Sequence, residues 1–410
     1  MTHPLETGEQ SVPADARLST QQLSILIFGL LAHGIGQAII FAILPPLGRE
    51  VGLGEIAITS MISASALIFT IASPWWGRLS DRTGRKPLIL LGLTGYSVGT
   101  LCFALVFWWG LNESVPYLFL WALLVRCCQS LIMSASGPAT VAYAADHTSR
   151  QHRMPTLAKL GTANSIAMIL GPILVSVASI GLLVPLYTAA VLAALAALTI
   201  WLFLPPDRQH PSQRPAVKRL KLSDSRLRVY LLCGIGIYSA FGSVQQTMAF
   251  RVQDMLLLGP EATAQYTGLS FVPSAICMLL MQLTVVQRFR GPPLQLVAGG
   301  ALFMCLGSIA IGFSTSLWSL VPALALMGTG FGLTAPAISS GASLAVNYDE
   351  QGGAAGLVAA GPAVGFIVGP VVGGALYQWH PEMGATLAAV VVLIVGIYAL
   401  RQAPKTVLQS

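Results

Sequence analysis

Four polar side chains stand inside long apolar stretches, where hydrocarbon neighbours offer them few partners. His33 and Gln37 lie in LLAHGIGQAIIF, and Arg126 and Gln129 lie in LLVRCCQSL. Residues three or four apart share one face of a helix, so the members of each pair are expected to point the same way. Imidazole exchanges a proton near neutral pH, and guanidinium carries a permanent positive charge. These groups are suited to moving a proton or to holding a polar ligand.

The same residues also have structural interpretations. Arg126 can hold helices together through backbone carbonyls, and His33 can be a neutral histidine that is hydrogen-bonded inside a bundle. A charge near the centre of a bilayer costs roughly 2.5 kcal/mol or more, so Arg126 is expected to face a cavity or a partner. None of the fifteen Asp and Glu residues lies deep in an apolar stretch.

A later stretch, YSAFGSVQQTMAFRVQD, adds an aromatic ring at Tyr238 and an amide at Gln245. Amides and aromatics of this kind either line a ligand cavity or satisfy neighbouring helices, and we predict a cavity role for Gln245. Further along, Arg251 and Asp254 stand three residues apart. They are expected to pair with each other as an external gate, or to be solvated separately.

The composition defines the elements that must position these groups. The chain has 410 residues, of which 55% are hydrophobic and only 9% charged, against about 25% charged in a soluble protein. Apolar runs repeatedly reach the ~20 residues that a helix needs to cross a bilayer. We predict an all-α integral membrane protein whose twelve spans lie at residues 23–44, 56–76, 88–110, 117–145, 156–178, 182–204, 229–250, 265–286, 294–314, 317–345, 354–377 and 384–401.

Positive charge predicts the orientation of these spans. With both termini in the cytoplasm, 19 of the 22 Lys and Arg residues fall on or beside cytoplasmic segments. Arg49 and Arg251 lie outside, and Arg126 lies within a span. Since cytoplasmic loops of membrane proteins are enriched in Lys and Arg, this orientation is favoured. We expect a plasma-membrane protein, in bacteria an inner-membrane protein, and the net charge of +7 gives no reason to expect a nucleic-acid partner.

The longest polar interval, residues 205–228, holds seven basic residues and four prolines and resembles a linker between two halves. A repeat supports that division. GPATVAYAAD at 137–146 resembles APAISSGASL at 335–344, and ILGP at 169–172 resembles IVGP at 367–370, both with an offset of 198 residues. Two landmarks with one offset indicate an internal duplication.

We therefore expect two pseudo-symmetric six-helix bundles with a ligand site between them near the bilayer midplane. The predicted segments are a cytoplasmic tail, the first bundle, the basic linker, the second bundle and a second cytoplasmic tail, at residues 1–22, 23–204, 205–228, 229–401 and 402–410.

The cytoplasmic loop between the second and third predicted spans is GRLSDRTGRKP. It resembles the loop signature of the major facilitator superfamily, G-x-L-S/A-D-R/K-x-G-R-K/R. The resemblance implies a twelve-helix transporter in which this loop is a conformational latch that braces the two halves in the outward-open state. An ordinary positively charged cytoplasmic loop would not require the acid or the two spaced glycines. The latch residues implied by the match are Gly77, Asp81, Arg82, Gly84, Arg85 and Lys86.

Two further motifs bear on that resemblance. The spacing Arg126-x-x-Gln129 is similar to the family's fourth-span motif R-x-x-Q-G, which is associated with proton coupling, although Ser130 replaces the glycine. The first span lacks the buried acid of many drug:proton antiporters in this family.

The eleventh predicted span carries a stripe of glycines at four-residue spacing, which lets two helices approach closely. It matches the family's antiporter signature, yet that signature belongs to the fifth span, where this chain keeps Gly171 and Pro172 alone. We therefore interpret the stripe first as helix packing. Its residues are Gly361, Gly365, Gly369, Pro370 and Gly373.

Other classes of protein are disfavoured by what the spans contain. The six cysteines lie in apolar runs without metal-ligand spacing, and no G-x4-G-K-S/T loop is present, so neither a metal nor a nucleotide cofactor is expected. No paired carboxylates or nucleophile with its base suggest an enzyme. We expect a monomeric transporter that moves a small organic molecule by alternating access, coupled to protons, as an exporter of a drug, metabolite or siderophore. An importer, a uniporter and a non-transporting membrane sensor are the alternatives.

Overall fold

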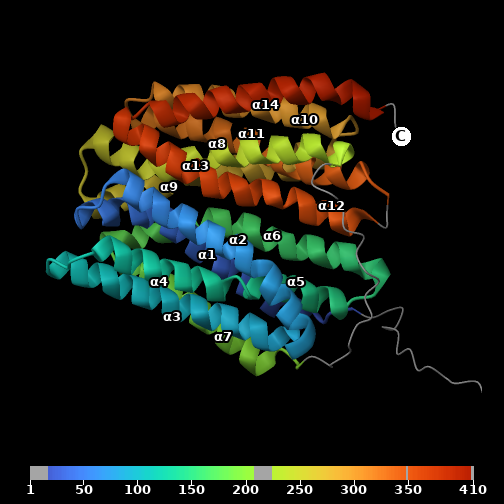
Figure 1. Cartoon of the computed structure of the whole chain (residues 1–410), viewed down its shortest axis with the longest axis horizontal. Helices are drawn as coiled ribbons and strands as arrows, with labels where there is room; N and C mark the ends of the chain where they lie inside the picture. Colours follow the sequence, from blue (N-terminus) through green and yellow to red (C-terminus); the bar gives the residue numbers. More distant parts are fainter. Residues whose placement is uncertain (1–16, 207–223, 348–349, 408–410) are drawn as a thin grey trace, which may run out of the picture.

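The computed structural model describes residues 17–206, 224–347 and 350–407. These residues form helices joined by short turns, and twelve helical stretches are long and apolar enough to cross a membrane. The predicted fold class is confirmed. Figure 1 shows α1 to α7 in one half of the view and α8 to α14 in the other, all running along the longest axis.

The first group of helices contains seven α-helices and one short 3-10 helix, η1. Their bounds are α1 Thr20–Glu50, α2 Glu55–Thr83, α3 Arg85–Asn112, α4 Leu118–Met133, α5 Ser136–Asp146, α6 Arg150–Val175, η1 Ser176–Ser179 and α7 Val184–Phe203.

The second group contains seven α-helices and one π-helical turn, η2. Their bounds are α8 Ser225–Leu256, α9 Pro260–Met281, η2 Gln282–Val286, α10 Pro293–Gly312, α11 Leu317–Leu344, α12 Gln351–Val358, α13 Ala360–Trp379 and α14 Met383–Val407.

Local signals in the sequence explain where several helices begin. Ser19 and Gln22 form a reciprocal capping box at the start of α1. Proline occupies the first turn of α9 and α10, where its missing N–H costs nothing. Asp224 caps α8 by accepting from the Arg226 backbone N–H at 3.0 Å. The Arg226 guanidinium also bonds Asp224 and holds the pKa of that carboxyl below its usual value.

Two spans that the sequence predicts as continuous are interrupted. The fourth divides into α4 and α5 at Ser134 and Ala135, and the eleventh divides into α12 and α13 at Ala359. Each interruption lies just before a proline, Pro138 or Pro362. Proline has no N–H for the carbonyl four residues earlier, and its ring crowds that carbonyl. The carbonyls that lose their donor are those of Ser134 and Val358, where the two interruptions occur.

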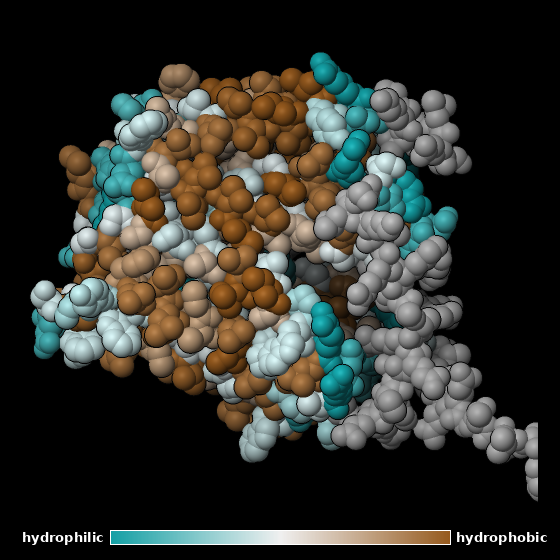
Figure 2. Space-filling model, in the orientation of Figure 1, coloured by the Kyte–Doolittle hydropathy of each residue, from teal (hydrophilic) through white to brown (hydrophobic). Residues whose placement is uncertain are grey.

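The outer surface is apolar along the middle of the molecule and polar at its two ends. Figure 2 shows hydrophobic residues across the central part of this face and hydrophilic residues toward both ends. Large exposed side chains such as Leu105, Trp121, Trp201 and Ile394 belong to this surface. An apolar belt with polar ends is the surface that a bilayer requires, so the chain is an integral membrane protein.

Candidate functional site

Arg126 lies in α4 with 1% of its surface exposed. Its Nη1 donates to Gln129 Oε1 at 2.7 Å, and its Nη2 donates to Gln37 Oε1 at 3.0 Å. Its Nε has no hydrogen-bond partner among the described residues. The first and fourth spans therefore meet through these three residues, and both acceptors are neutral amides.

Gln129 is held firmly from the other side by α3. Its Nε2 donates to Thr100 Oγ1 at 2.6 Å and to the Tyr96 carbonyl at 3.2 Å. Gly99 of α3 faces it, and a side-chain carbon at Gly99 would lie 2.6 Å from Gln129 Cγ. The close approach of α3 and α4 thus fixes the Gln129 amide with its oxygen directed at the guanidinium.

Gln37 is held less firmly, and His33 stands one turn before it on α1. The Gln37 Nε2 has only the Met133 sulfur at 3.2 Å, which is a weak acceptor. The His33 ring lies 5.4 Å from the Tyr96 ring and 6.4 Å from the Phe69 ring, centroid to centroid. Its Nδ1 has no partner in the described part of the chain. We call Arg126, Gln129, Gln37 and His33 the arginine cluster.

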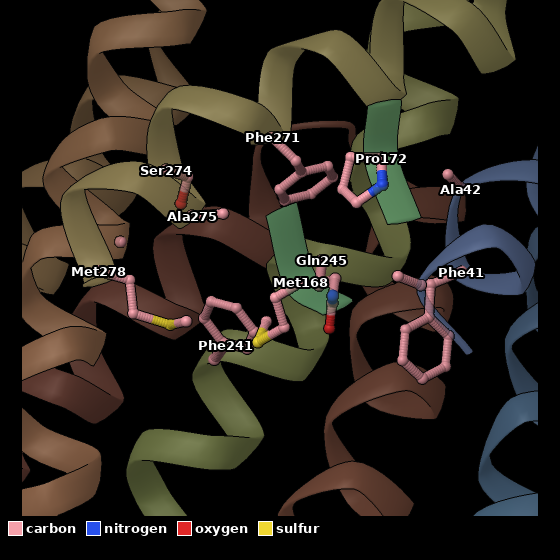
Figure 3. Close-up of a pocket in the computed structure, with 12 residues that line it drawn as sticks. Phe41, Ala42, Met168, Pro172, Phe241, Gln245, Phe271, Ser274, Ala275 and Met278 are labelled. Atoms are coloured by element: carbon pink, nitrogen blue, oxygen red, sulfur yellow. The ribbon is translucent and has the colours of Figure 1, made fainter. Parts of the chain in front are cut away.

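A cavity lies between the two groups of helices, near the arginine cluster along α1. Figure 3 shows Phe41, Phe241, Phe271 and the methionines around it, with the Gln245 amide among them. The Gln245 Oε1 is buried and has no partner among described residues. The cavity is lined by Ala38, Phe41, Ala42, Met168 and Pro172 of α1 and α6, and by Phe241, Gln245, Phe271, Ser274, Ala275, Met278 and Gly328 of α8, α9 and α11.

Tyr238 is on the same helix as Gln245 but packs elsewhere. Its ring meets Phe331 edge-on at 5.1 Å and Phe366 at 5.7 Å between centroids. Its Cβ lies against Gly365, one member of the glycine stripe. Tyr238 is therefore in the interface of α8 with α11 and α13, and it is not among the residues that line the cavity.

The glycine stripe lies along the contact between α13 and α8. A side-chain carbon at Gly361, Gly365, Gly369 or Gly373 would come within 3.2 Å of an atom of α8. Pro370 stands inside α13. In the first half, Gly171 lies against Ala38 of α1, and the Pro172 carbonyl faces Gly268 of α9. These glycines allow helices to pack backbone to backbone.

An ionic cluster that the sequence analysis missed joins the two groups of helices at the C-terminal end of α1. Arg49 Nη2 donates to Glu55 Oε1 at 2.6 Å, and its Nη1 donates to Asp254 Oδ1 at 2.6 Å. The guanidinium lies 4.7 Å from the centroid of the Phe250 ring. The Tyr377 hydroxyl donates to Asp254 Oδ2 at 2.7 Å. We call Arg49, Glu55, Asp254 and Tyr377 the external seal, because the orientation predicted from the distribution of Lys and Arg puts this end of the spans outside.

Asp254 consequently pairs across the halves and not with Arg251. Arg251 is buried and donates from Nη2 to the carbonyls of Gly312 and Ser314 at 2.8 and 2.9 Å. The predicted pairing of Arg251 with Asp254 is replaced by these contacts because α8 directs the two side chains to different neighbours. The sequence signal for the seal was limited to the scarcity of charges at the ends of the spans that are predicted to lie outside.

The loop between α2 and α3 is a tight turn at Gly84, whose φ of +94° favours glycine. Arg85 Nη2 donates to Asp81 Oδ1 at 2.5 Å, and its Nε donates to Asp146 Oδ2 at 3.0 Å. Lys86 Nζ reaches the Trp201 carbonyl at 2.9 Å. Arg82 is exposed, and a side-chain carbon at Gly77 would meet nothing within 4 Å. The loop is thus tied to α5 and α7 of its own half.

The comparison with known proteins identifies the family. The model of the Major Facilitator Superfamily matches residues 26–348. The chain belongs to this superfamily. Its members are transporters, so the chain is a membrane transporter of a small molecule and not an enzyme.

Relatives with similar sequences extend over almost the whole chain. Multidrug resistance protein 1 of Bacillus subtilis is 27% identical over 87% of this chain and 90% of the relative. Quinolone resistance protein NorA of Staphylococcus aureus is 24% identical over 92% of this chain and 96% of the relative.

Solved structures of transporters share the fold. The human organic anion transporter MFSD10 has a TM-score of 0.65 at 19% identity, and the alignment covers 92% of this chain and 99% of that one. A bacterial homolog of the human lysosomal transporter Spinster, in an inward-facing and unoccupied conformation, has a TM-score of 0.74 at 14% identity. That alignment covers 95% of this chain and 99% of the other.

Proposed function

We propose that this transporter is a proton-coupled exporter of small amphiphilic molecules in a bacterial inner membrane, with both termini in the cytoplasm. The single observation that carries this proposal is the cavity between the halves, whose lining is mostly aromatic and apolar and includes one amide oxygen, Gln245 Oε1, without a partner among the described residues. Such a lining suits the apolar body of an amphiphile and offers one acceptor for a donor on it. The resistance functions named for the bacillary and staphylococcal relatives support efflux.

The arginine cluster is the proposed coupling site. His33 exchanges the proton, and Arg126 senses it electrostatically because two positive charges on neighbouring side chains repel each other in a medium of low dielectric constant. Gln37 links this event to the cavity, since it precedes Phe41 by one helical turn on the same face of α1. Gln129 holds the guanidinium in place through its contacts with α3.

Alternating access requires contacts between the two halves that form in one state and break in the other. We infer that the seal of Arg49 with Asp254 keeps the external side closed in this conformation. The residues at 77–86 act as the latch of the opposite, outward-open state. The two bundles, residues 23–204 and 229–401, move about the cavity, and the basic linker at 205–228, most of which is outside the described residues, connects them in the cytoplasm. Because both walls of the cavity come from one chain, the working unit is a monomer.

Inside-out membrane vesicles test this function. A proton gradient is imposed, and its collapse is followed with a pH-sensitive dye while cationic, neutral and anionic amphiphiles are added in turn. We expect at least one class to collapse the gradient, and Arg126→Ala to reduce that rate at least tenfold.

Arg288→Ala is the matched control, because it removes an exposed arginine at the end of the second group's first hairpin. It should leave the rate unchanged. Failure of every class, or an unchanged rate in Arg126→Ala, would contradict the proposed coupling.

A further inference from the structure

Arg126 is a buried charge that has no carboxylate partner in the part of the chain that the structure describes. It is 1% exposed, and its acceptors are two amide oxygens. The helices that supply the hydrogen bonds of the arginine cluster, α1, α3 and α4, carry one acid, Glu50, at the last residue of α1. Glu50 is thirteen residues from Gln37, or about 20 Å along the helix at 1.5 Å per residue. An uncompensated buried charge is costly, by several kcal/mol even after relaxation.

The guanidinium also keeps part of its binding capacity unused. A carboxylate bonds an arginine most strongly through two parallel N–H groups. Nε and Nη2 form one such edge of the plane, and Nε has no partner among the described residues. Among the described residues, Nη2 donates to Gln37 alone, whose own amide N–H has the Met133 sulfur as acceptor. The opposite edge is occupied by Gln129, which α3 fixes in place.

Gln37 is therefore the replaceable partner of Arg126. It is only half-buried, and its replacement would exchange a neutral acceptor for a charged one. The His33 Nδ1, which has no partner in the described residues, lies one turn away on the same helix face and can offer a further polar contact.

We propose that the Nε–Nη2 edge of Arg126 binds a monoanionic group, which takes the place of the Gln37 amide oxygen. The group is the carboxylate of a transported molecule or a small inorganic anion. In the first case the apolar body of the molecule extends along α1 into the cavity, because Phe41 follows Gln37 by about 6 Å of helix rise. This assignment of a substrate class rests on the proposed function.

The test measures equilibrium binding in purified, detergent-solubilised protein without any proton gradient. Benzoate and benzamide form a matched pair, because they share the ring and differ in charge, and chloride represents the inorganic anion. Isothermal titration at constant ionic strength gives the dissociation constants. We expect benzoate to bind at least tenfold more tightly than benzamide, and Arg126→Gln to abolish that difference.

Two further variants keep the test decisive if Arg126→Gln fails to fold. Arg126→Lys retains the charge but loses the planar edge, so it should weaken benzoate binding at least threefold. Arg251→Gln removes another buried arginine, held by carbonyls far from the cluster, and should leave benzoate binding unchanged. Competition between chloride and benzoate at one site would support the proposal and identify inorganic anions as a second source of the group.

Wild-type protein that binds benzoate no better than benzamide, and does not bind chloride, would overturn the anion site. So would undiminished benzoate binding in Arg126→Gln. Either result would leave the vesicle experiment untouched, since gradient collapse by a cationic or neutral amphiphile needs no anion site. Conversely, if no class of amphiphile collapsed the gradient in wild-type vesicles while the purified protein still bound benzoate, only the proposed function would be contradicted.

Discussion

Two arginines of this transporter differ in what balances their charge. Arg49 has carboxylates on both sides, from Glu55 on α2 and Asp254 on α8, so it joins the two halves. Arg126 has amides on both sides, from Gln37 and Gln129, all within one half. The two arginines also differ in burial, since the Arg49 side chain is 19% exposed and Arg126 is 1% exposed. The more deeply buried charge is the one for which the described residues supply no counter-charge.

The difference indicates that Arg49 affects the conformational equilibrium, whereas Arg126 is suited to binding a ligand. A salt bridge between halves is favourable in one conformation and must break in the other, so it biases the equilibrium between them. An arginine whose acceptors are neutral and belong to its own half does not bias that equilibrium. Its charge is stabilised most when an anion binds to it. We therefore expect the external seal to bias which side is open and the arginine cluster to select what is bound.

The largest expected effect comes from giving Arg126 the partner that Arg49 already has. Gln37→Glu places a carboxylate next to Nη2, and an internal carboxylate competes with any anion for that edge. We expect benzoate binding to weaken at least tenfold, which isothermal titration measures. Gln37→Met is the control, because it has similar length without charge and should keep the binding. Unchanged benzoate binding in Gln37→Glu would show that the two arginines do not differ in the proposed way.

The next largest effect is expected from a bulky substitution in the close helix packing beside the external seal. Gly374 of α13 faces Thr59 of α2 across the halves, where a side-chain carbon would lie 2.9 Å from Thr59 Cβ. Gly374→Leu should separate the external ends at a cost of about 1–3 kcal/mol to the closed state.

Spin labels at Ile56→Cys and Leu257→Cys, in a background without the native cysteines, would report a longer mean distance between the two halves. Gly299→Leu is the matched control, because a side chain there meets nothing within 4 Å. A distance distribution that is equal in the two variants would argue against the seal.

Removing one carboxylate from Arg49 should have a smaller effect. Asp254→Asn keeps the shape and loses the charge, and the Asp254 side chain is 44% exposed, so water screens the pair. The expected cost to the closed state is about 1 kcal/mol, or roughly a fivefold shift in population. The same label pair measures it. If Asp254→Asn shifted the distances as much as Gly374→Leu, the ionic contact would matter more than we infer.

The smallest effect is expected from Tyr377→Phe. This variant removes one hydrogen bond to Asp254 and leaves the Arg49 contacts and the ring beside Phe250 in place. A single hydrogen bond contributes about 1 kcal/mol or less when its acceptor remains accessible to water. We expect a change of less than fivefold in the labelled population. A larger change would mean that Tyr377, and not Arg49, orients Asp254 for the seal.

Contacts close in sequence were predictable, and contacts between distant segments were not. Arg126 and Gln129 are three residues apart on one helix, so their hydrogen bond follows from helix geometry. Arg49 and Asp254 are 205 residues apart, and nothing local joins them. Asp254 was instead expected to pair with Arg251, three residues away, or to be solvated separately. The pairing was wrong because a helix fixes which residues share a face, whereas the neighbouring helices decide what that face meets.

The cavity shows the same limit. Gln245 was predicted as a cavity residue from its polar type, and the structure has it there, beside Phe41, Met168 and Phe271. Those three residues had no signal of their own, because an apolar side chain in an apolar span looks the same whether it faces lipid, another helix or a ligand. Tyr238 illustrates the reverse case, since an aromatic residue on the same span was a candidate for the cavity lining, whereas its ring packs against Phe331 and Phe366.

The sequence by itself determined the class of the molecule: a chain with 9% charged residues and repeated apolar runs has to form membrane-spanning helices, because backbone groups in a bilayer must be satisfied internally. Its repeat and its loop motif also implied the transporter family. Only the tertiary structure decided that Arg126 is left with neutral amides while Arg49 is neutralised from both halves. Pairing between distant side chains depends on how helices cross, and the free energy of that crossing is spread over many apolar contacts that no short motif encodes.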